Sequence, residues 1–319
     1  MAKILIAFNT LKEGFEELKE KHQVTFAPEG RDFTADELMD MVADYDVLCS
    51  VFDIPITKDL IAKGNNLKLI SNYAVGYNNI DIDFAREKGI VVTNTPKSVV
   101  EPTAELAMAL MMSCSRKTVE LDRLMRQERD NLKITRLDRL GCDLYGKTIG
   151  IVGYGNIGEA VARRCRAFGM KVLYNKRNRL DEATEKEKEL TYASLEEILK
   201  RCDVISVHTP YSASSHHLFG EKEFGMMKDG AIFINTSRGA VVDEAALVKA
   251  LQSGTIRAAG LDVFENKDIP SPQLYELENV CMTPHVGTQT YDARLSMIHE
   301  LVDNVLGFLQ EDRPISRVV

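Results

Sequence analysis

The 319-residue chain lacks several features that mark particular classes of protein. Its six cysteines are scattered, with no C-x-x-C pair and no metal-ligand spacing. We therefore expect buried, reduced thiols and no metal site. An excess of basic residues is also missing, because the formal charge is −8 and the isoelectric point is near 5.4. This balance argues against a nucleic-acid-binding protein, which normally presents a basic face.

Long hydrophobic runs and repeats are absent as well. The longest apolar stretch, Leu106 to Cys114, is too short to span a bilayer. Met1-Ala2-Lys3 leads directly into a strand-like run, so we expect no signal peptide. The composition, with 45% hydrophobic and 28% charged residues, is that of a globular protein, and the length suffices for two domains. A cytoplasmic enzyme fits these observations.

The chain does contain a glycine pattern between a strand and a helix. The β-branched run Thr148–Val152 leads into Gly153-Tyr154-Gly155-Asn156-Ile157-Gly158, and a helical pattern and a second strand-like run follow. This order is typical of a dinucleotide-binding unit. We expect Gly153 to allow a tight turn, Gly155 to let the backbone approach a pyrophosphate, and Gly158 to let the helix pack closely. The helix N-terminus supplies free N–H groups for the phosphates.

Before this unit, residues 1 to about 95 alternate between strand-like and helix-like segments. Such alternation predicts a parallel sheet covered by helices, and the lack of a glycine fingerprint predicts a domain without a nucleotide. The strand-like segments are Lys3–Phe8, Val24–Ala27, Val47–Val51, Leu67–Ser71 and Val91–Asn94. The helix-like segments are Leu11–Lys21, Ala35–Ala43, Lys58–Ala62 and Ile82–Lys88.

A long helical pattern follows the first domain. Pro102 can serve as the first residue of a helix that runs to about Gln127, which is long enough to connect two domains. The charged, irregular segment Glu128–Gly141 predicts a loop over the surface or over a partner subunit. The last helical segment, Ala293–Leu309, has no strand after it in the second domain, so we expect it to return to the first.

Polar and ionisable residues follow four strand-like runs of the second domain. Ligands of α/β sheets collect at the carboxyl ends of strands. Arg238 can hold a carboxylate in two parallel hydrogen bonds, and His285 can shuttle a proton at neutral pH. Each alone could be a cap or a surface group, but together with a nicotinamide they are the parts needed to interconvert a 2-hydroxy acid and a 2-keto acid. The four strand-like runs are Val204–Val207, Ala231–Asn235, Ala258–Asp262 and Val280–Thr283.

We interpret the charge run Asp181–Glu189 as a solvated helix face or loop.

Several motifs, in the right order and spread over essentially the whole chain, resemble those of the D-isomer-specific 2-hydroxyacid dehydrogenase family, in particular its glyoxylate/hydroxypyruvate reductase-like branch. Besides the glycine fingerprint, they are Asn72-Tyr73-Ala74-Val75-Gly76-Tyr77-Asn78-Asn79-Ile80-Asp81, Asn94-Thr95-Pro96, His208-Thr209-Pro210, Asn235-Thr236-Ser237-Arg238-Gly239, Gly260-Leu261-Asp262-Val263-Phe264-Glu265 and Thr283-Pro284-His285-Val286-Gly287.

The resemblance implies roles for individual residues. The backbone amides of Val75 and Gly76 would bind the substrate carboxylate, and Arg238 would hold the carboxylate and the carbonyl oxygen. His285 would give a proton to that oxygen as hydride arrives, while Val51 and Phe52 would lie near the substrate side group. The cofactor-binding positions would be Thr103, Gly153, Gly155, Asn156, Ile157, His208, Thr209, Pro210, Thr236, Ser237, Asp262, His285 and Gly287, with Thr103, Thr236 and Asp262 beside the nicotinamide.

The chain departs from the family at the end of its second nucleotide-binding strand. NAD-preferring members have an acidic residue there, whereas this chain has Lys176, followed by Arg177. A carboxylate would repel a 2′-phosphate and a Lys-Arg pair would attract one, so we predict a preference for NADPH over NAD(H), with both side chains contacting the phosphate. The alternative is a solvated basic loop.

A second departure concerns catalysis. The family's catalytic Glu lies five residues after the Asp of the Leu-Asp-Val motif, and this position is Lys267. That Glu keeps the imidazolium charged, and an ammonium would do the reverse. Three outcomes stay open: Asp268 or Glu265 replaces the acid, the enzyme works without a carboxylate partner at lower pH, or the chain has lost turnover and regulates as a cofactor-binding protein.

We therefore predict two Rossmann-like or flavodoxin-like parallel-sheet α/β domains with an active-site cleft between them. Residues 1–99 and 289–319 would form the discontinuous substrate domain, and residues 100–288 the dinucleotide-binding domain. The predicted activity is NADPH-dependent reduction of glyoxylate, hydroxypyruvate or similar 2-keto acids by a cytoplasmic homodimer. The alternatives are a non-catalytic NAD(P)-sensing protein and a formate or phosphite dehydrogenase on the same scaffold.

Overall fold

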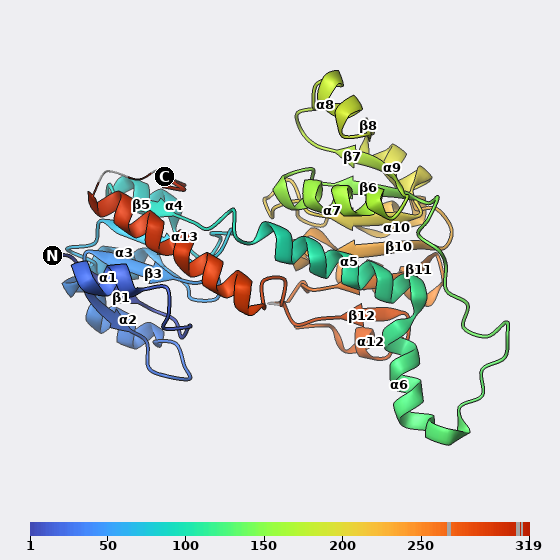
Figure 1. Cartoon of the computed structure of the whole chain (residues 1–319), viewed down its shortest axis with the longest axis horizontal. Helices are drawn as coiled ribbons and strands as arrows, with labels where there is room; N and C mark the ends of the chain where they lie inside the picture. Colours follow the sequence, from blue (N-terminus) through green and yellow to red (C-terminus); the bar gives the residue numbers. More distant parts are fainter. Residues whose placement is uncertain (267–268, 311–312, 314) are drawn as a thin grey trace. The chain divides into compact units, whose positions relative to one another are not determined.

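The chain forms two compact units. The computed structural model describes residues 1–266, 269–310, 313 and 315–319. One unit comprises Met1–Val99 and Thr288–Val319, and the other comprises Val100–Gly287 (Figure 1). Each unit has its own parallel sheet. The predicted fold class of two parallel-sheet α/β domains is confirmed.

The first unit is built on a five-stranded sheet of order β2-β1-β3-β4-β5. Its central strands are buried on both faces, as is usual for a parallel sheet covered by helices. Helix α13 belongs to this unit, and its Ile298, Leu301 and Val305 share the hydrophobic core with β1. The elements are β1 (Lys3–Ile6), α1 (Glu16–Lys21), β2 (Gln23–Phe26), α2 (Ala35–Met41), β3 (Val47–Ser50), α3 (Lys58–Lys63), β4 (Leu69–Asn72), α4 (Ile82–Glu87), β5 (Val91–Thr93) and α13 (Tyr291–Gln310).

Local sequence signals set several element boundaries in this unit. Thr34 and Glu37 form a capping box at the start of α2, and Thr57 and Asp81 cap α3 and α4. The helix predicted from Leu11 starts only at Glu16. Gly14 has φ +85°, a left-handed conformation that does not fit a right-handed helix, so the helix begins only after it.

The second unit is built on a seven-stranded sheet of order β12-β11-β10-β9-β6-β7-β8. The order changes direction at β6, whose neighbours are β7 on one side and β9 on the other. The carboxyl ends of β6 and β9 therefore form a topological switch point, where ligands of such sheets bind. The strands are β6 (Thr148–Val152), β7 (Lys171–Asn175), β8 (Leu190–Tyr192), β9 (Val204–Val207), β10 (Ala231–Asn235), β11 (Ile256–Leu261) and β12 (Val280–Met282).

Strand β8 was not predicted, because its three residues are too few to show a periodic pattern and they lie beside a charged run.

Helices cover both faces of this sheet. The helices are α5 (Val100–Arg116), α6 (Thr118–Glu128), α7 (Asn156–Ala167), α8 (Glu182–Glu187), α9 (Leu195–Arg201), α10 (Glu221–Met226), α11 (Glu244–Gln252) and α12 (Pro272–Tyr275).

The single long helix predicted from Pro102 to Gln127 was wrong. Lys117 adopts a left-handed conformation, with φ 55°, and divides the segment into α5 and α6. The helix also starts at Val100, so Pro102 lies inside its first turn, where a missing N–H is tolerated. Figure 1 shows α6 turning away from α5 and standing out from the second sheet with the long loop that follows it. Helical spacing continues across Lys117, so the sequence pattern gives no sign of the bend.

Two further features bear on the composition-based expectations. All six cysteines are free, and four of them are buried. Burial raises the pKa of the Cys202 thiol to about 12, so this thiol stays protonated at neutral pH. Within the described ranges, no helix combines the length and the apolar character needed to cross a bilayer.

Candidate functional site

The glycine turn after β6 has the geometry that its three glycines require. Gly153 has φ +94°, and a Cβ there would lie 2.6 Å from the carbonyl carbon of His208. A Cβ on Gly158 would lie 2.6 Å from the carbonyl oxygen of Gly153, so this position lets α7 pack against the turn. A Cβ on Gly155 would meet no atom within 4 Å. The space beside Gly155 is therefore open for a ligand that approaches the backbone.

Helix α7 begins directly at this open space. Gly155 is its N-cap residue, and Asn156 and Ile157 are its first helical residues. The first backbone N–H groups of a helix have no partner within the helix, and the helix dipole places partial positive charge there. The turn and the helix start thus fit the pyrophosphate of a dinucleotide.

The end of β9 contributes a neutral histidine. Nε2 of His208 lies 2.9 Å from Oγ of Ser206, and Thr209 donates its hydroxyl to the carbonyl of Val152 at 3.2 Å. Burial lowers the pKa of His208 to about 4, so the ring is uncharged at neutral pH. Its Nδ1 is buried and has no hydrogen-bond partner in the described part of the chain. Such an atom is suited to a bound ligand.

The end of β10 carries Arg238 on a loop that one asparagine organises. Oδ1 of Asn235 accepts hydrogen bonds from the backbone N–H and the hydroxyl of Ser237, at 3.0 and 2.7 Å. Nδ2 of Asn235 donates to the carbonyl of Arg238 at 3.1 Å, and Nη1 of Arg238 donates to the carbonyl of Ser237 at 2.7 Å. The hydroxyl of Thr236 is buried without a partner among the described residues. Asn235, which the sequence analysis did not single out, therefore fixes the backbone around Arg238.

Strands β11 and β12 end next to Asp262 and Thr283, and the segment that follows β12 is held by Asp262. This buried carboxylate accepts hydrogen bonds from the hydroxyl of Thr283 at 2.7 Å and from the backbone N–H groups of Val286 and Gly287 at 2.8 and 3.0 Å. Burial is the main cause that raises the pKa of Asp262 above its ordinary value. The backbone of His285 has φ 54°, an uncommon conformation that the surrounding hydrogen bonds hold in place.

Strands β10 and β12 are the two neighbours of β11 in the sheet. Arg238 and His285 consequently follow the carboxyl ends of strands on either side of Asp262. Thr103, on α5, lies beside Gly287, since a Cβ on that glycine would be 3.3 Å from its hydroxyl. The second unit therefore brings together, at one edge of its sheet, the predicted cofactor residues after β6 and β9 and the predicted catalytic residues Arg238 and His285.

The segment after β11 is held by a group of polar residues that we call the Glu244 cluster, comprising His217, Glu244 and Glu265. The carboxylate of Glu244, which is buried, accepts hydrogen bonds from the backbone N–H groups of Glu265 at 3.1 Å and Ser271 at 2.6 Å. The carboxylate of Glu265 accepts from the backbone of Glu244 at 3.1 Å and contacts Nε2 of His217. These contacts keep Glu265 within the cluster and argue against its serving as the acid partner of His285. Lys267 and Asp268 lie outside the described residues.

The end of β7 carries the basic loop that was predicted to select the cofactor. Lys176 is partly exposed and Arg177 is exposed, and neither forms an ion pair with any described residue. Arg179 differs, because its Nε and Nη2 donate to the carboxylate of Glu185 at 2.8 and 2.7 Å. Oε1 of Glu185 also accepts a hydrogen bond from the hydroxyl of Tyr174, at an O···O distance of 2.6 Å. The charge of Arg179 is thus neutralised, while those of Lys176 and Arg177 are available to an anion.

Glu185 is the exception to one expectation. The charge run Asp181–Glu189 was expected to be a solvated helix face or loop, and most of its residues are exposed, but the side chain of Glu185 is buried against Tyr174. Arg179 and then Tyr174, by donating hydrogen bonds, lower the pKa of Glu185 to about 2. Helical spacing gives no sign of this burial, because the residues that cover Glu185 come from a neighbouring strand and loop.

The predicted substrate residues of the first unit follow β3 and β4. Phe52 is partly exposed, and Val75 and Gly76 are half-buried. Three consecutive carbonyl groups in this loop have fixed partners. The backbone N–H of Thr95 donates to the carbonyl of Ala74 at 3.0 Å, Nδ2 of Asn94 donates to that of Val75 at 2.8 Å, and Nδ2 of Asn72 donates to that of Gly76 at 2.7 Å.

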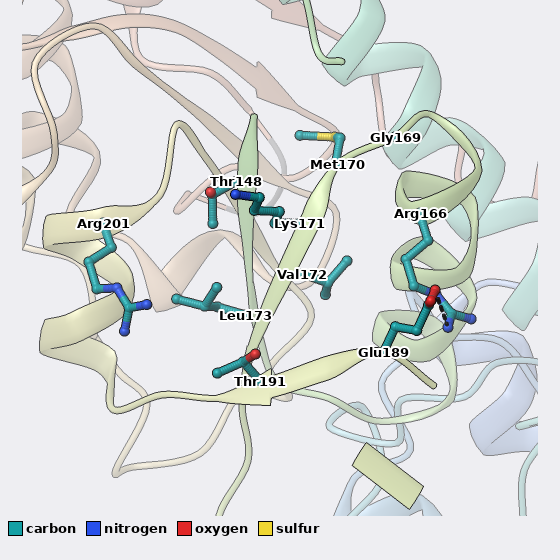
Figure 2. A pocket seen from close by; sticks show the side chains of 10 residues that line it. All are labelled: Thr148, Arg166, Gly169, Met170, Lys171, Val172, Leu173, Glu189, Thr191 and Arg201. Atoms are coloured by element: carbon teal, nitrogen blue, oxygen red, sulfur yellow. Dashed lines mark ion pairs between the residues drawn. The ribbon is translucent and has the colours of Figure 1, made fainter. Parts of the chain in front are cut away.

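A hollow of about 570 Å³ lies at the end of β6 and β7 that is opposite to the glycine turn. Figure 2 shows Arg166, Lys171 and Arg201 around it, with Arg166 paired to Glu189. The hollow is formed at the amino ends of these strands, beside Thr148 and Lys171. Ligands of such sheets bind at the carboxyl ends, so we do not assign the dinucleotide to it.

The chain is similar to known proteins over most of its length. A family model described as "D-isomer specific 2-hydroxyacid dehydrogenase, NAD binding domain" matches residues 108–287. A glyoxylate reductase of Thermococcus litoralis is 43% identical over 280 residues, which span 87% of this chain and 84% of that protein. A glyoxylate reductase of Thermococcus gammatolerans is 38% identical over 315 residues, or 98% of this chain and 94% of that protein.

Solved structures of two reductases are also similar to this chain. The structure of a glyoxylate reductase from Paecilomyes thermophila matches with a TM-score of 0.89 and 33% identity, and the match covers 99% of this chain and 98% of that one. An NADPH-dependent glyoxylate/hydroxypyruvate reductase from Sinorhizobium meliloti, solved with NADP and malonate, matches with a TM-score of 0.83 and 29% identity over 100% of this chain and 97% of that one.

Proposed function

Because the chain belongs to the D-isomer-specific 2-hydroxyacid dehydrogenase family, we propose that it uses NADPH to reduce glyoxylate, hydroxypyruvate or similar small 2-keto acids to D-2-hydroxy acids. The observation that carries the proposal is the position of Arg238 and His285 after strands β10 and β12, on the same sheet edge as the glycine turn. Several relatives that share nearly the full length of the chain are named glyoxylate reductases, which supports this substrate class.

Each residue would contribute one part of the chemistry. The carboxylate of the 2-keto acid would accept hydrogen bonds from the backbone amides of Val75 and Gly76, and the guanidinium of Arg238 would hold the carboxylate and the carbonyl oxygen. The nicotinamide, when bound, supplies the hydride that adds to the carbonyl carbon. His285 would donate its proton to the carbonyl oxygen, so that one hydride and one proton complete the hydroxyl group.

The family's acid partner of His285 is missing from its usual position in this chain. Lys267 occupies the family's Glu position, and the contacts of Glu265 lie within the Glu244 cluster. We therefore propose Asp268 as the replacing acid. A carboxylate beside the imidazolium would favour its charged form and extend the reductive activity toward higher pH.

The NADPH preference rests on Lys176 and Arg177. Arg179 is paired with Glu185, whereas Lys176 and Arg177 form no ion pair with a described residue, so these two cations would attract the 2′-phosphate. The relative from Sinorhizobium meliloti is described as NADPH-dependent, which supports the same choice here.

We also propose that the protein is a homodimer, with a contact through the segment 118–141, which we call the arm. The arm exposes several large apolar side chains: Leu137 is 81% exposed, Met125 64%, Leu140 58% and Ile134 48%. Exposed apolar side chains grouped on one projecting segment are typical of an interaction surface. Arg139 pairs with the buried carboxylate of Glu120 inside the arm and with Glu278 outside it, and the second pair ties the arm to its own unit.

A panel assay tests the activity. Purified protein is mixed with NADPH or NADH and each of a series of 2-keto acids, and the loss of absorbance of the reduced cofactor is recorded. We expect turnover of glyoxylate or hydroxypyruvate, with a higher kcat/KM for NADPH. Cofactor binding without turnover of any 2-keto acid would instead support a sensing protein and overturn the proposed reaction.

A further inference from the structure

The loop after β4 presents a row of oriented peptide groups. The carbonyls of Ala74, Val75 and Gly76 accept hydrogen bonds from Thr95, Asn94 and Asn72, respectively, at 2.7 to 3.0 Å. In a trans peptide the N–H points opposite to the C=O of the same plane, and the described residues contain no cis peptide. The N–H groups of Val75, Gly76 and Tyr77 therefore point away from the side that holds the carbonyls.

These three N–H groups are available to a ligand. In the described ranges of the chain, none of them donates a hydrogen bond to a protein atom. Val75 and Gly76 are half-buried, so their amides are only partly open to water. Successive backbone N–H groups with fixed directions form a concavity that binds anions, and a carboxylate is such an anion.

Asn72 is itself held in one orientation. It is fully buried at the end of β4, where its Oδ1 accepts the hydroxyl hydrogen of Ser50 at 2.8 Å. Nδ2 of Asn79 lies 3.4 Å from the same oxygen and also donates to the carbonyls of Val51 and Ile54, at 2.9 and 3.0 Å. With Oδ1 committed to these donors, Nδ2 of Asn72 is directed to the carbonyl of Gly76.

We propose that Asn72 and Asn94 are positioning residues of the carboxylate site: they hold the peptide groups of residues 75–77 so that the backbone N–H groups are aimed at the substrate carboxylate. This inference rests on the proposed function and extends it, because it assigns the binding of the carboxylate to two side chains that do not touch it. An amide is required at position 72, since the side chain must accept from Ser50 and donate to Gly76 at once.

The test is the variant Asn72→Asp. The ionised form of the new side chain would place a carboxylate oxygen against the carbonyl of Gly76, whereas its protonated form can still donate to that carbonyl. We expect the KM for glyoxylate to rise at least about tenfold at pH 8 and to fall toward the wild-type value as the pH is lowered. The KM for NADPH should stay within about twofold, because the glycine turn belongs to the other unit.

A matched control is available in the same unit. Nδ2 of Asn66 also donates to a backbone carbonyl, that of Ala43, at 2.8 Å, but this bond is exposed and lies at another loop. Asn66→Asp should leave both KM values unchanged. Asn94→Ala, which introduces no titratable group, should raise the KM for glyoxylate at every pH. Thermal unfolding of each variant checks that the fold is retained.

A binding measurement separates this inference from the proposed reaction. Oxalate binding in the presence of NADPH is measured by calorimetry for the wild type, Asn72→Asp and Asn66→Asp. Weaker oxalate binding by Asn72→Asp alone supports the positioning role even if the wild type reduces none of the keto acids. Equal oxalate affinity and a pH-independent, wild-type KM for Asn72→Asp would overturn it.

Discussion

The backbone N–H of His285 donates a hydrogen bond to the carbonyl of Asp262 at 2.9 Å, and the side chain of Asp262 holds the residues on both sides of that histidine. Thr283 donates its hydroxyl to this carboxylate before the histidine, and Val286 and Gly287 donate their N–H groups after it. The position of the proposed proton donor is thus set by one buried carboxylate at the end of the neighbouring strand.

Asp262→Asn should therefore impair catalysis through the backbone of His285. An amide has one acceptor oxygen instead of two, so at least one of the three donors loses its partner. We expect kcat for glyoxylate reduction to fall about tenfold or more and the free energy of unfolding to fall by about 1–3 kcal/mol. Urea unfolding and steady-state kinetics measure the two effects. Thr283→Ser, which keeps the hydroxyl donor, is the control, and an unchanged kcat for Asp262→Asn would contradict the positioning role.

Lys267→Glu should place an acid at the position where the resemblance to the family implies one. Replacing the ammonium of Lys267, which disfavours the imidazolium, with a carboxylate adds to the effect proposed for Asp268, so the reductive rate should persist to higher pH than in the wild type. The pH dependence of kcat for both proteins measures the change. If rate and pH profile are the same in both, residue 267 does not act on His285, and Asp268→Asn then tests the neighbouring acid.

The double variant Lys176→Asp/Arg177→Gln should reverse the cofactor preference. A carboxylate at position 176 repels the 2′-phosphate of NADPH and can accept hydrogen bonds from the ribose hydroxyls of NADH. We expect the ratio of kcat/KM for NADPH to that for NADH to fall by about a hundredfold. At about 1.4 kcal/mol for each factor of ten, this corresponds to about 2.8 kcal/mol. Lys171→Asp, at the exposed start of the same strand, should leave the ratio unchanged. A wild type that already prefers NADH would refute the basis of this prediction.

Glu185→Gln should change the acid stability of the protein. The folded state lowers the pKa of Glu185 from 4.5 to about 2. A lowered pKa means that the carboxylate stabilises the fold above the unfolded pKa, and that this contribution is lost as the pH falls toward the folded pKa. The variant should be less stable than the wild type at pH 7, and the difference should shrink as the pH falls from about 4.5 to about 2. Urea titrations at neutral and at acidic pH measure it, and a difference independent of pH would show that the charge of Glu185 is not its cause.

Leu137→Asp should shift the protein from dimer to monomer. Burying a carboxylate at an apolar contact costs free energy, whereas the same change on a solvated arm costs almost nothing. Light scattering across a dilution series gives the molar mass of the wild type and the variant. Ile269→Asp places the same charge at another exposed apolar residue, outside the arm, and serves as the control. A monomeric wild type would remove the proposed contact altogether.

Local sequence signals predicted the fold class and the parts of the site that are continuous in sequence. The run before Gly153, the spacing of the three glycines and the residues after each strand are all read within a few neighbours, because a parallel α/β sheet repeats one short unit. Arg238 and His285 could be singled out for the same reason: the carboxyl end of a strand is visible in the sequence.

Contacts between distant segments were decided only by the tertiary structure. Asp262 reaches across to the segment after β12, Glu244 holds both ends of the segment 265–271, and Glu185 is covered by Tyr174 from the neighbouring strand. The bend at Lys117 is likewise accompanied by a pairing of Glu120 with Arg139, far along the chain. Sequence periodicity reports which face of an element is apolar. Which buried polar groups find partners depends on residues that only folding brings within hydrogen-bond distance.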